Sequence, residues 1–115
     1  MWNKPTNNQL SKLPPLYSTE EVALKEKIIQ QKYFIAGSTW FACEYSDGLF
    51  FGFVILNNDY EMAEWGYFSL EELSSVKVSF LEIDRDLYFE PRQAQKIPEI
   101  CKAQNWNKEV MTIEE

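Results

Sequence analysis

The chain has 115 residues, of which 45% are hydrophobic and 16% aromatic, so it is long enough for one domain with a sizeable core. Eleven basic residues stand against 18 acidic ones, and the formal net charge of −7 opposes direct binding to nucleic acid, which depends on clustered lysine and arginine. No apolar run reaches the roughly 20 residues that cross a bilayer, and the polar start is unlike a signal peptide, which predicts a soluble, cytoplasmic protein without membrane contact.

We expect three parts along the chain. Residues 1–12 form an N-terminal arm or a short helix, because Thr6 can cap a helical turn. A single domain spans 13–104, and 105–115 form a polar C-terminal tail.

Two consecutive prolines, Pro14 and Pro15, end the first part. Each proline disfavours helical geometry in the residue before it, which predicts an extended stretch from Leu13 to Glu20. Either this stretch packs its apolar side chains against the domain, or it is a proline motif for a partner; the side chains concerned are Leu13, Leu16 and Tyr17.

The centre of the expected sheet is a hairpin from Thr39 to Leu56 with a turn at Ser46-Asp47-Gly48, preceded by a strand over Lys27–Ala36. Its second arm is apolar on both faces, which indicates a central strand covered on both sides. Strict alternation in the first arm predicts one face with Trp40, Ala42 and Glu44 and another with Phe41, Cys43 and Tyr45.

A further strand is expected at Glu64–Phe68, followed by a short helix that Ser69 and Glu72 cap reciprocally. Val76–Phe80 has the alternation of a strand. Within 81–89 a continuous strand would put Arg85 among apolar residues, so either a turn breaks the register or Arg85 reaches a carboxylate.

The last helix is expected within Gln93–Gln104, with Pro98 in its first turn and Ile100 and Cys101 as apolar contacts. Together these elements predict an α+β fold: a single domain with a mainly antiparallel sheet of about five strands and two or three short helices.

The sequence contains no histidine, which removes the commonest general base and the usual zinc ligand. Cys43 and Cys101 are expected to be free thiols, with Cys43 a small buried hydrophobe and not a nucleophile. Four isolated glycines cannot form a phosphate-binding loop. We therefore expect no catalytic residue, metal or cofactor.

Carboxylate pairs are the remaining option for an enzyme: Asp84 with Asp86, or Glu61 with Glu64, could hold a cation or perform acid–base chemistry. A solvated acidic face is the simpler reading. On an extended strand, Glu82, Asp84 and Asp86 would project from one face about 6.6 to 6.8 Å apart and could occupy a basic groove meant for nucleic acid.

Aromatic residues cluster around Gly66, and some of these rings could be exposed interface anchors even though most should be core. The polar and aromatic residues expected to bind a partner are Tyr17, Glu20, Glu64, Trp65, Glu82, Asp84, Arg85 and Asp86.

Four stretches, LPPLYSTEE from Leu13, LFFGFV from Leu49, WGYFSLEEL from Trp65 and IDRDLYFEP from Ile83, resemble the domain-of-unknown-function family 2958. The resemblance spans roughly Leu10 to Arg92. It implies a small intracellular protein of bacteria, phages or plasmids, often carried on mobile DNA, and it implies no established activity.

Two function classes follow from these observations. The first is a non-enzymatic, acidic protein-binding module, in one version a mobile-element protein that inhibits a host defence protein or another nucleic-acid-binding protein. The second is a small metal-dependent or carboxylate-based enzyme of unknown substrate. The sequence does not determine the oligomeric state.

Overall fold

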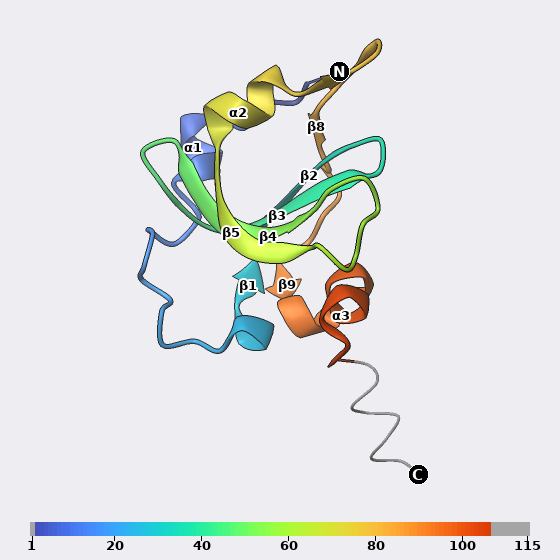
Figure 1. Ribbon diagram of the computed structural model, residues 1–115. Coiled ribbons are helices and arrows are strands. Elements are labelled where there is room, and N and C mark those ends of the chain that lie inside the picture. The colour runs from blue at the N-terminus through green and yellow to red at the C-terminus, as the bar shows by residue number, and fades with distance from the viewer. Residues whose placement is uncertain (1, 107–115) are drawn as a thin grey trace.

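Residues 2–106, which the computed structural model describes, form an antiparallel sheet of five strands in the order β5-β4-β3-β2-β8 (Figure 1). The strands are β2 Gln31–Ile35, β3 Ser38–Ser46, β4 Leu49–Ile55, β5 Glu64–Ser69 and β8 Asp84–Arg85. The sheet and the short helices around it confirm the predicted α+β class.

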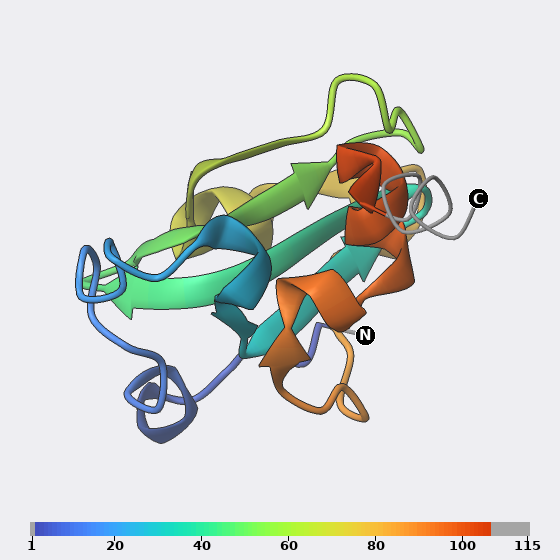
Figure 2. The same cartoon turned by 90° about the horizontal axis from the view of Figure 1, so that it is seen from below.

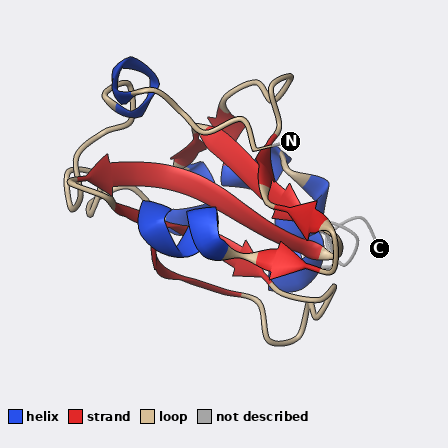
Figure 3. Cartoon of the chain, turned by 90° about the horizontal axis from the view of Figure 1, so that it is seen from above, coloured by secondary structure: helices blue, strands red, loops and turns tan. Residues whose placement is uncertain are grey.

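Helices cover both faces of this sheet. The α2 face carries α1 Asn7–Leu10 and α2 Leu70–Ser75, and Figure 3 shows α2 lying across the sheet. The opposite face, the α3 face, is covered by short elements seen from below in Figure 2: η1 Leu24–Glu26, β1 Ile28–Ile29, β9 Arg92–Gln93, η2 Ala94–Lys96 and α3 Pro98–Gln104. A small hairpin of β6 Lys77–Val78 and β7 Leu81–Glu82 follows α2.

Local sequence signals set several of these elements. Asp47 and Gly48 have φ of 45° and 89°, the positive values that a two-residue hairpin turn requires, which confirms the central hairpin. Ser69 Oγ accepts a hydrogen bond from the Glu72 amide at the start of α2. Pro98 occupies the first turn of α3, and Ile100 and Cys101 are its buried contacts, as expected.

A β-bulge at Cys43 reverses the faces of the end of β3. The register with β4 shifts between Ala42 and Glu44, so Cys43 is an extra residue. Because one extra residue displaces the alternation by one position, Glu44 shares a face with its cross-strand neighbour Phe51, and Tyr45 takes the opposite face. The predicted faces of Glu44 and Tyr45 were therefore wrong.

Two cores lie on either side of β4, which confirms that this strand is central and covered on both faces. The core on the α2 face consists of Leu10, Leu13, Tyr33, Ile35, Trp40, Ala42, Phe50, Phe68, Leu73 and Ile83. The core on the α3 face consists of Ile29, Phe41, Cys43, Phe53, Ile55, Ala94, Ile97 and Ile100.

The N-terminal segment packs on the domain from Trp2 onward. The ring centroid of Trp2 lies 6.0 Å from that of Tyr33, and Leu10 is a core residue. Thr6 caps α1 through a reciprocal capping box with Gln9. The expected tail begins within this description, since Trp106 contacts the core on the α3 face; its residues 107–115 lie outside the described part.

The segment after the two prolines is not extended as predicted. It forms turns from Leu16 to Glu21, and Tyr17 has a positive φ of 70° and is 58% exposed, so its ring does not pack against the core. The cause is long-range: the Glu44 carboxylate accepts hydrogen bonds from the amides of Tyr17 and Thr19 and bends the chain around itself.

The chain between 76 and 89 is also more broken than predicted. The expected strand over Val76–Phe80 is reduced to β6, and Ile83 is buried between β7 and β8. Arg85 lies in β8, so it is not in a turn. Among residues 2–106 it reaches no carboxylate, and it donates to the Asn3 carbonyl and to Gln9 Oε1. The N-terminal segment supplies these neutral acceptors.

We predict opposite outcomes for alanine at two paired glycines of β4 and β5. A Cβ at Gly52 would lie 1.8 Å from the Phe41 carbonyl oxygen, whereas a Cβ at Gly66 would meet no atom within 4 Å. Gly52→Ala should lower the free energy of unfolding by about 3 kcal/mol. Gly66→Ala should leave it unchanged or raise it by up to about 1 kcal/mol. Urea denaturation measures both, and equal losses would contradict the strand register.

Candidate functional site

The eight residues predicted to bind a partner lie in different parts of the fold. Tyr17 and Glu20 line a cavity of about 310 Å³ on the α3 face. Glu64 lines a second cavity, of about 560 Å³, on the α2 face. A third cavity of about 500 Å³ beside β8 is lined by Asp84, Arg85 and Asp86.

The remaining two candidates have structural contacts. Trp65 packs edge-on against Phe53, and its indole nitrogen donates to Gln104 Oε1 at 3.2 Å, so it links the sheet to α3. Glu82 accepts a hydrogen bond from the Trp2 amide at 2.7 Å. The structure therefore does not bring the eight residues together into one surface.

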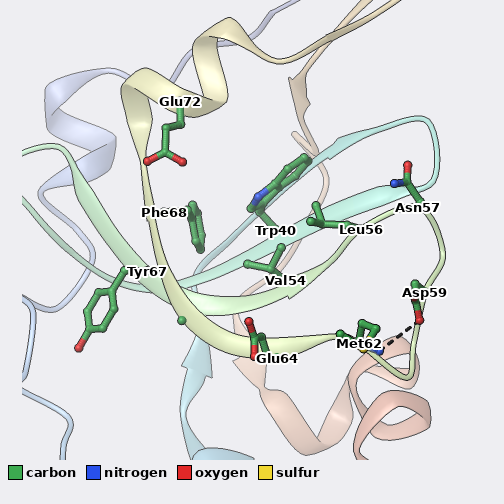
Figure 4. A pocket seen from close by; sticks show the side chains of 11 residues that line it. Trp40, Val54, Leu56, Asn57, Asp59, Met62, Glu64, Tyr67, Phe68 and Glu72 are labelled. Carbon is green, nitrogen blue, oxygen red and sulfur yellow. Dashed lines mark hydrogen bonds between the residues drawn. The ribbon is translucent and has the colours of Figure 1, made fainter.

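The second cavity, called the acidic cavity below, is the strongest candidate for a binding site (Figure 4). It lies between the α2 face of the sheet, the start of α2 and the loop before β5. Its lining consists of Trp40, Val54, Leu56, Asn57, Asp59, Met62, Glu64, Gly66, Tyr67, Phe68 and Glu72. The ring of Tyr67 points away from it (Figure 4).

The acidic cavity arises from a row of small residues across three strands. Ala42, Gly52 and Gly66 are cross-strand neighbours and share the α2 face. The adjacent rows carry large side chains, with Trp40 at one side and Phe68 at the other. Because no atom lies within 4 Å of a Cβ at Gly66, packing does not require glycine there, and its missing side chain keeps the cavity open.

The charge of the acidic cavity is not compensated by the residues around it. Within residues 2–106, the carboxylates of Glu64 and Glu72 have no hydrogen-bond or ion-pair partner, and the lining includes no lysine or arginine. Asp59 Oδ1 accepts only a hydrogen bond from the Met62 amide, at 3.1 Å. These carboxylates give the cavity a negative potential that favours a cationic group.

Trp40 supplies a donor in the same cavity. Its side chain is buried, at 8% exposure, and no residue of the described range 2–106 accepts a hydrogen bond from its indole nitrogen. Figure 4 shows the nitrogen-bearing edge of the ring facing into the cavity. The nitrogen atom itself is not fully buried, since Trp2 Nε1 is the buried side-chain nitrogen without a partner among residues 2–106. The Trp40 N–H is therefore accessible from the cavity and can donate to an acceptor on a bound group.

The cavity on the α3 face is built differently, because two of its three charged side chains, Lys27 and Glu44, are already paired with each other. Lys27 Nζ donates to the carbonyl and hydroxyl oxygens of Thr19 and lies 3.9 Å from Glu44 Oε2. Glu44 also accepts from the Tyr17 amide and from the amide and hydroxyl of Thr19. With two hydrogen bonds and an ion pair made by the Lys27 ammonium, this cluster holds the loop over the sheet and leaves little for a ligand.

The acidic row expected on the last strand does not form. Glu82 lies in β7 and Asp84 in β8, which belong to different sheets. Asp84 Oδ1 accepts from the amide and side chain of Asn3 and from the Arg85 amide, and Asp86 accepts from the Tyr88 amide. Burial raises the pKa of the Asp84 carboxyl, but the hydrogen bonds from Asn3 and from the Arg85 amide lower it, and the net shift of the pKa is downward.

Two other kinds of feature are absent from the described range. No group of three or more histidine, cysteine, aspartate or glutamate side chains between residues 2 and 106 is placed to hold a metal ion. No helix in that same range is long and apolar enough to cross a bilayer.

Sequence reasoning identified Glu64 but missed Trp40, Asp59 and Glu72 as members of one site. A signal for two of them was present: Ser69 fixes the start of α2, which places Glu72 in its first turn above the sheet, and alternation put Trp40 on one face of β3. The sequence pattern does not reveal the strand pairing that brings these residues together in one cavity.

The fold and the site define a small α+β domain with an acidic cavity between a helix and the edge of an antiparallel sheet. The chain belongs to the family described as "Protein of unknown function (DUF2958)", whose model matches residues 26–104. This match confirms the family resemblance, although it begins after the LPPLYSTEE stretch. No curated protein and no solved structure matches the chain.

Removing the buried carboxylate of Glu44 should destabilise the fold strongly. Glu44→Ala leaves Lys27, which is 6% exposed, without its counter-ion, and it frees two loop amides. We expect a loss of about 3–5 kcal/mol in the free energy of unfolding. The control is Glu20→Ala, an exposed residue of the same cavity, which should change it by less than about 0.5 kcal/mol. Similar small losses for both would show that the ion pair is not structural.

Both thiols should be inert in the folded protein. Burial raises the pKa of Cys43 to about 12, and burial also raises the pKa of Cys101. Because the thiolate is the reactive form, a thiol reagent at pH 8 should label neither cysteine before unfolding and both after it. Labelling of native Cys43 at the rate of a small free thiol would contradict its buried position.

Proposed function

We propose that this protein is a non-enzymatic, cytoplasmic module that binds a protein partner, with the acidic cavity as the receptor for a basic side chain. The observation that carries the proposal is that Glu64 and Glu72, which lack partners within residues 2–106, line the same cavity as Trp40, whose indole N–H faces into it and donates to no residue of that range. The net charge of −7 favours a basic partner.

The shape and chemistry of the cavity suit lysine or arginine. The walls at Val54, Leu56 and Phe68 are apolar and can contact the methylene groups of such a side chain. The carboxylates can accept charge-assisted hydrogen bonds from its head group. A carbonyl oxygen of the same partner could accept a hydrogen bond from the Trp40 indole nitrogen. A free cation has no such acceptor and could not make this contact.

The class of partner that we propose is a protein with a basic surface, in the first place a host defence protein or another nucleic-acid-binding protein. Such proteins carry clustered lysine and arginine because they contact phosphates. An acidic module carried on mobile DNA would inhibit one by occupying that surface. The acidic group in this proposal is the cavity and not the row Glu82, Asp84 and Asp86.

Neutralising the acidic cavity should abolish partner binding without unfolding the protein. The tagged protein, its double variant Glu64→Gln/Glu72→Gln and the control Glu71→Gln are used to capture proteins from host lysate at low and high salt, with mass spectrometry as readout. Glu71 is in the same helical turn as Glu72 but does not line the acidic cavity.

We expect a stoichiometric partner that wild type and Glu71→Gln retain at low salt and that the double variant binds at least tenfold more weakly, because each charge-assisted hydrogen bond contributes more than about 1.4 kcal/mol. High salt should weaken the complex. A partner that all three forms bind equally would place the interaction elsewhere and reject the acidic cavity as the receptor.

A further inference from the structure

The outer edge of the sheet at the acidic cavity is a strand with one unpaired side. β5 is the end strand of the five-stranded sheet and, within residues 2–106, pairs only with β4. Its register places Leu70 as the donor to the Gly48 carbonyl, at 2.9 Å. Hydrogen-bonded pairs alternate with non-bonded pairs along an antiparallel ladder. Counting back from Leu70, the backbone N–H and C=O groups of Trp65 and Tyr67 therefore point outward, away from β4.

This edge and the acidic cavity are formed by the same strand. Glu64, Gly66 and Phe68 alternate along β5 on the α2 face, and all three line the cavity. Side chains of neighbouring strands that lie opposite each other share a face. A segment added beside β5 would therefore place every second side chain over the acidic cavity.

Apart from the charge of Glu64, the sequence of the β5 edge lacks the features that normally block strand addition. Its sequence EWGYFS contains no lysine or proline and, at six residues, is long enough to pair. The opposite end strand, β8, has only two residues, and the N-terminal segment covers it through the bonds of Asn3 to Asp84 and Arg85.

We propose that the partner binds by adding an extended segment to β5, with a lysine or arginine beside Glu64 and a large apolar side chain beside Gly66. The inference rests on the proposed function and specifies its binding mode. Charge complementarity with Glu64 and Glu72 selects the basic residue, and the open space at Gly66 accepts the apolar one. Backbone hydrogen bonds supply affinity, and the cavity supplies specificity.

The probe for this mode is the peptide acetyl-Thr-Arg-Thr-Phe-Thr-Arg-Thr-amide, which presents Arg, Phe and Arg on one face when extended. Two matched controls are the same peptide with Glu in place of Arg, and the same peptide with N-methyl groups on alternate amides, which keeps the side chains and prevents strand pairing. Spermidine tests a free polycation. Isothermal titration calorimetry measures binding, and hydrogen exchange follows the Trp65 and Tyr67 amides.

Two variants isolate the backbone bond. Tyr67→Pro removes the outward N–H, which proline tolerates on an edge strand, and Tyr67→Thr removes the same ring but keeps the N–H. The ratio of their affinities for the peptide therefore reports the hydrogen bond. Circular dichroism confirms that each variant is folded, and the N-methylated peptide gives the same test on the wild-type protein.

We expect the Arg peptide to bind the wild-type protein, and the N-methylated and Glu peptides to bind it at least tenfold more weakly. Tyr67→Pro should bind the Arg peptide at least tenfold more weakly than Tyr67→Thr does. In the wild-type complex, the amides of Trp65 and Tyr67 should exchange more slowly than in the free protein. Equal binding of the N-methylated peptide, with loss in Glu64→Gln, would overturn strand addition and leave the cavity as a side-chain receptor. Binding of spermidine as tightly as the peptide would overturn the inference, and so would no binding of the Arg peptide. The lysate capture tests the proposed function separately.

Discussion

The β-bulge at Cys43 is the constraint on which both faces of the sheet depend. By displacing the alternation of β3, it turns Glu44 to the α3 face, where this carboxylate holds the loop after the prolines and pairs with Lys27. The same stretch brings the Phe41 carbonyl against Gly52, so a side chain cannot stand there. One extra residue thus turns a carboxylate into a buried ionic cluster on one face, and the same stretch of β3 requires glycine at position 52 in the row of small residues on the other.

The two faces consequently differ in how their polar groups are satisfied. On the α3 face, Lys27 and Glu44 engage Thr19 and each other, and such a saturated network fixes a single arrangement of the chain. On the α2 face, Glu64 and Trp40 present an acceptor and a donor that no residue from 2 to 106 uses. The saturated ionic cluster therefore lies on one side of the sheet, and the recognition that we propose uses the other.

The proposed binding site combines two features that are weak alone. An acidic group on a protein surface is normally solvated, and an edge strand is normally protected. At β5 the acidic group and the open edge coincide, because Glu64 belongs to the strand whose outer amides pair with no other strand of the described range. This coincidence gives a partner both a charge to recognise and a backbone to pair with.

The sequence by itself determined the elements whose signals are local: the hairpin at Asp47-Gly48, the start of α2 at Ser69, the start of α3 at Pro98, and a sheet covered on both faces. These follow from the φ preferences and hydrogen-bonding capacity of neighbouring residues. Only the tertiary structure decided the bulge at Cys43, the neutral partners of Arg85 and the acidic cavity. Each of these depends on groups that are distant along the chain and that only strand register and chain packing bring together, so no short-range pattern encodes them.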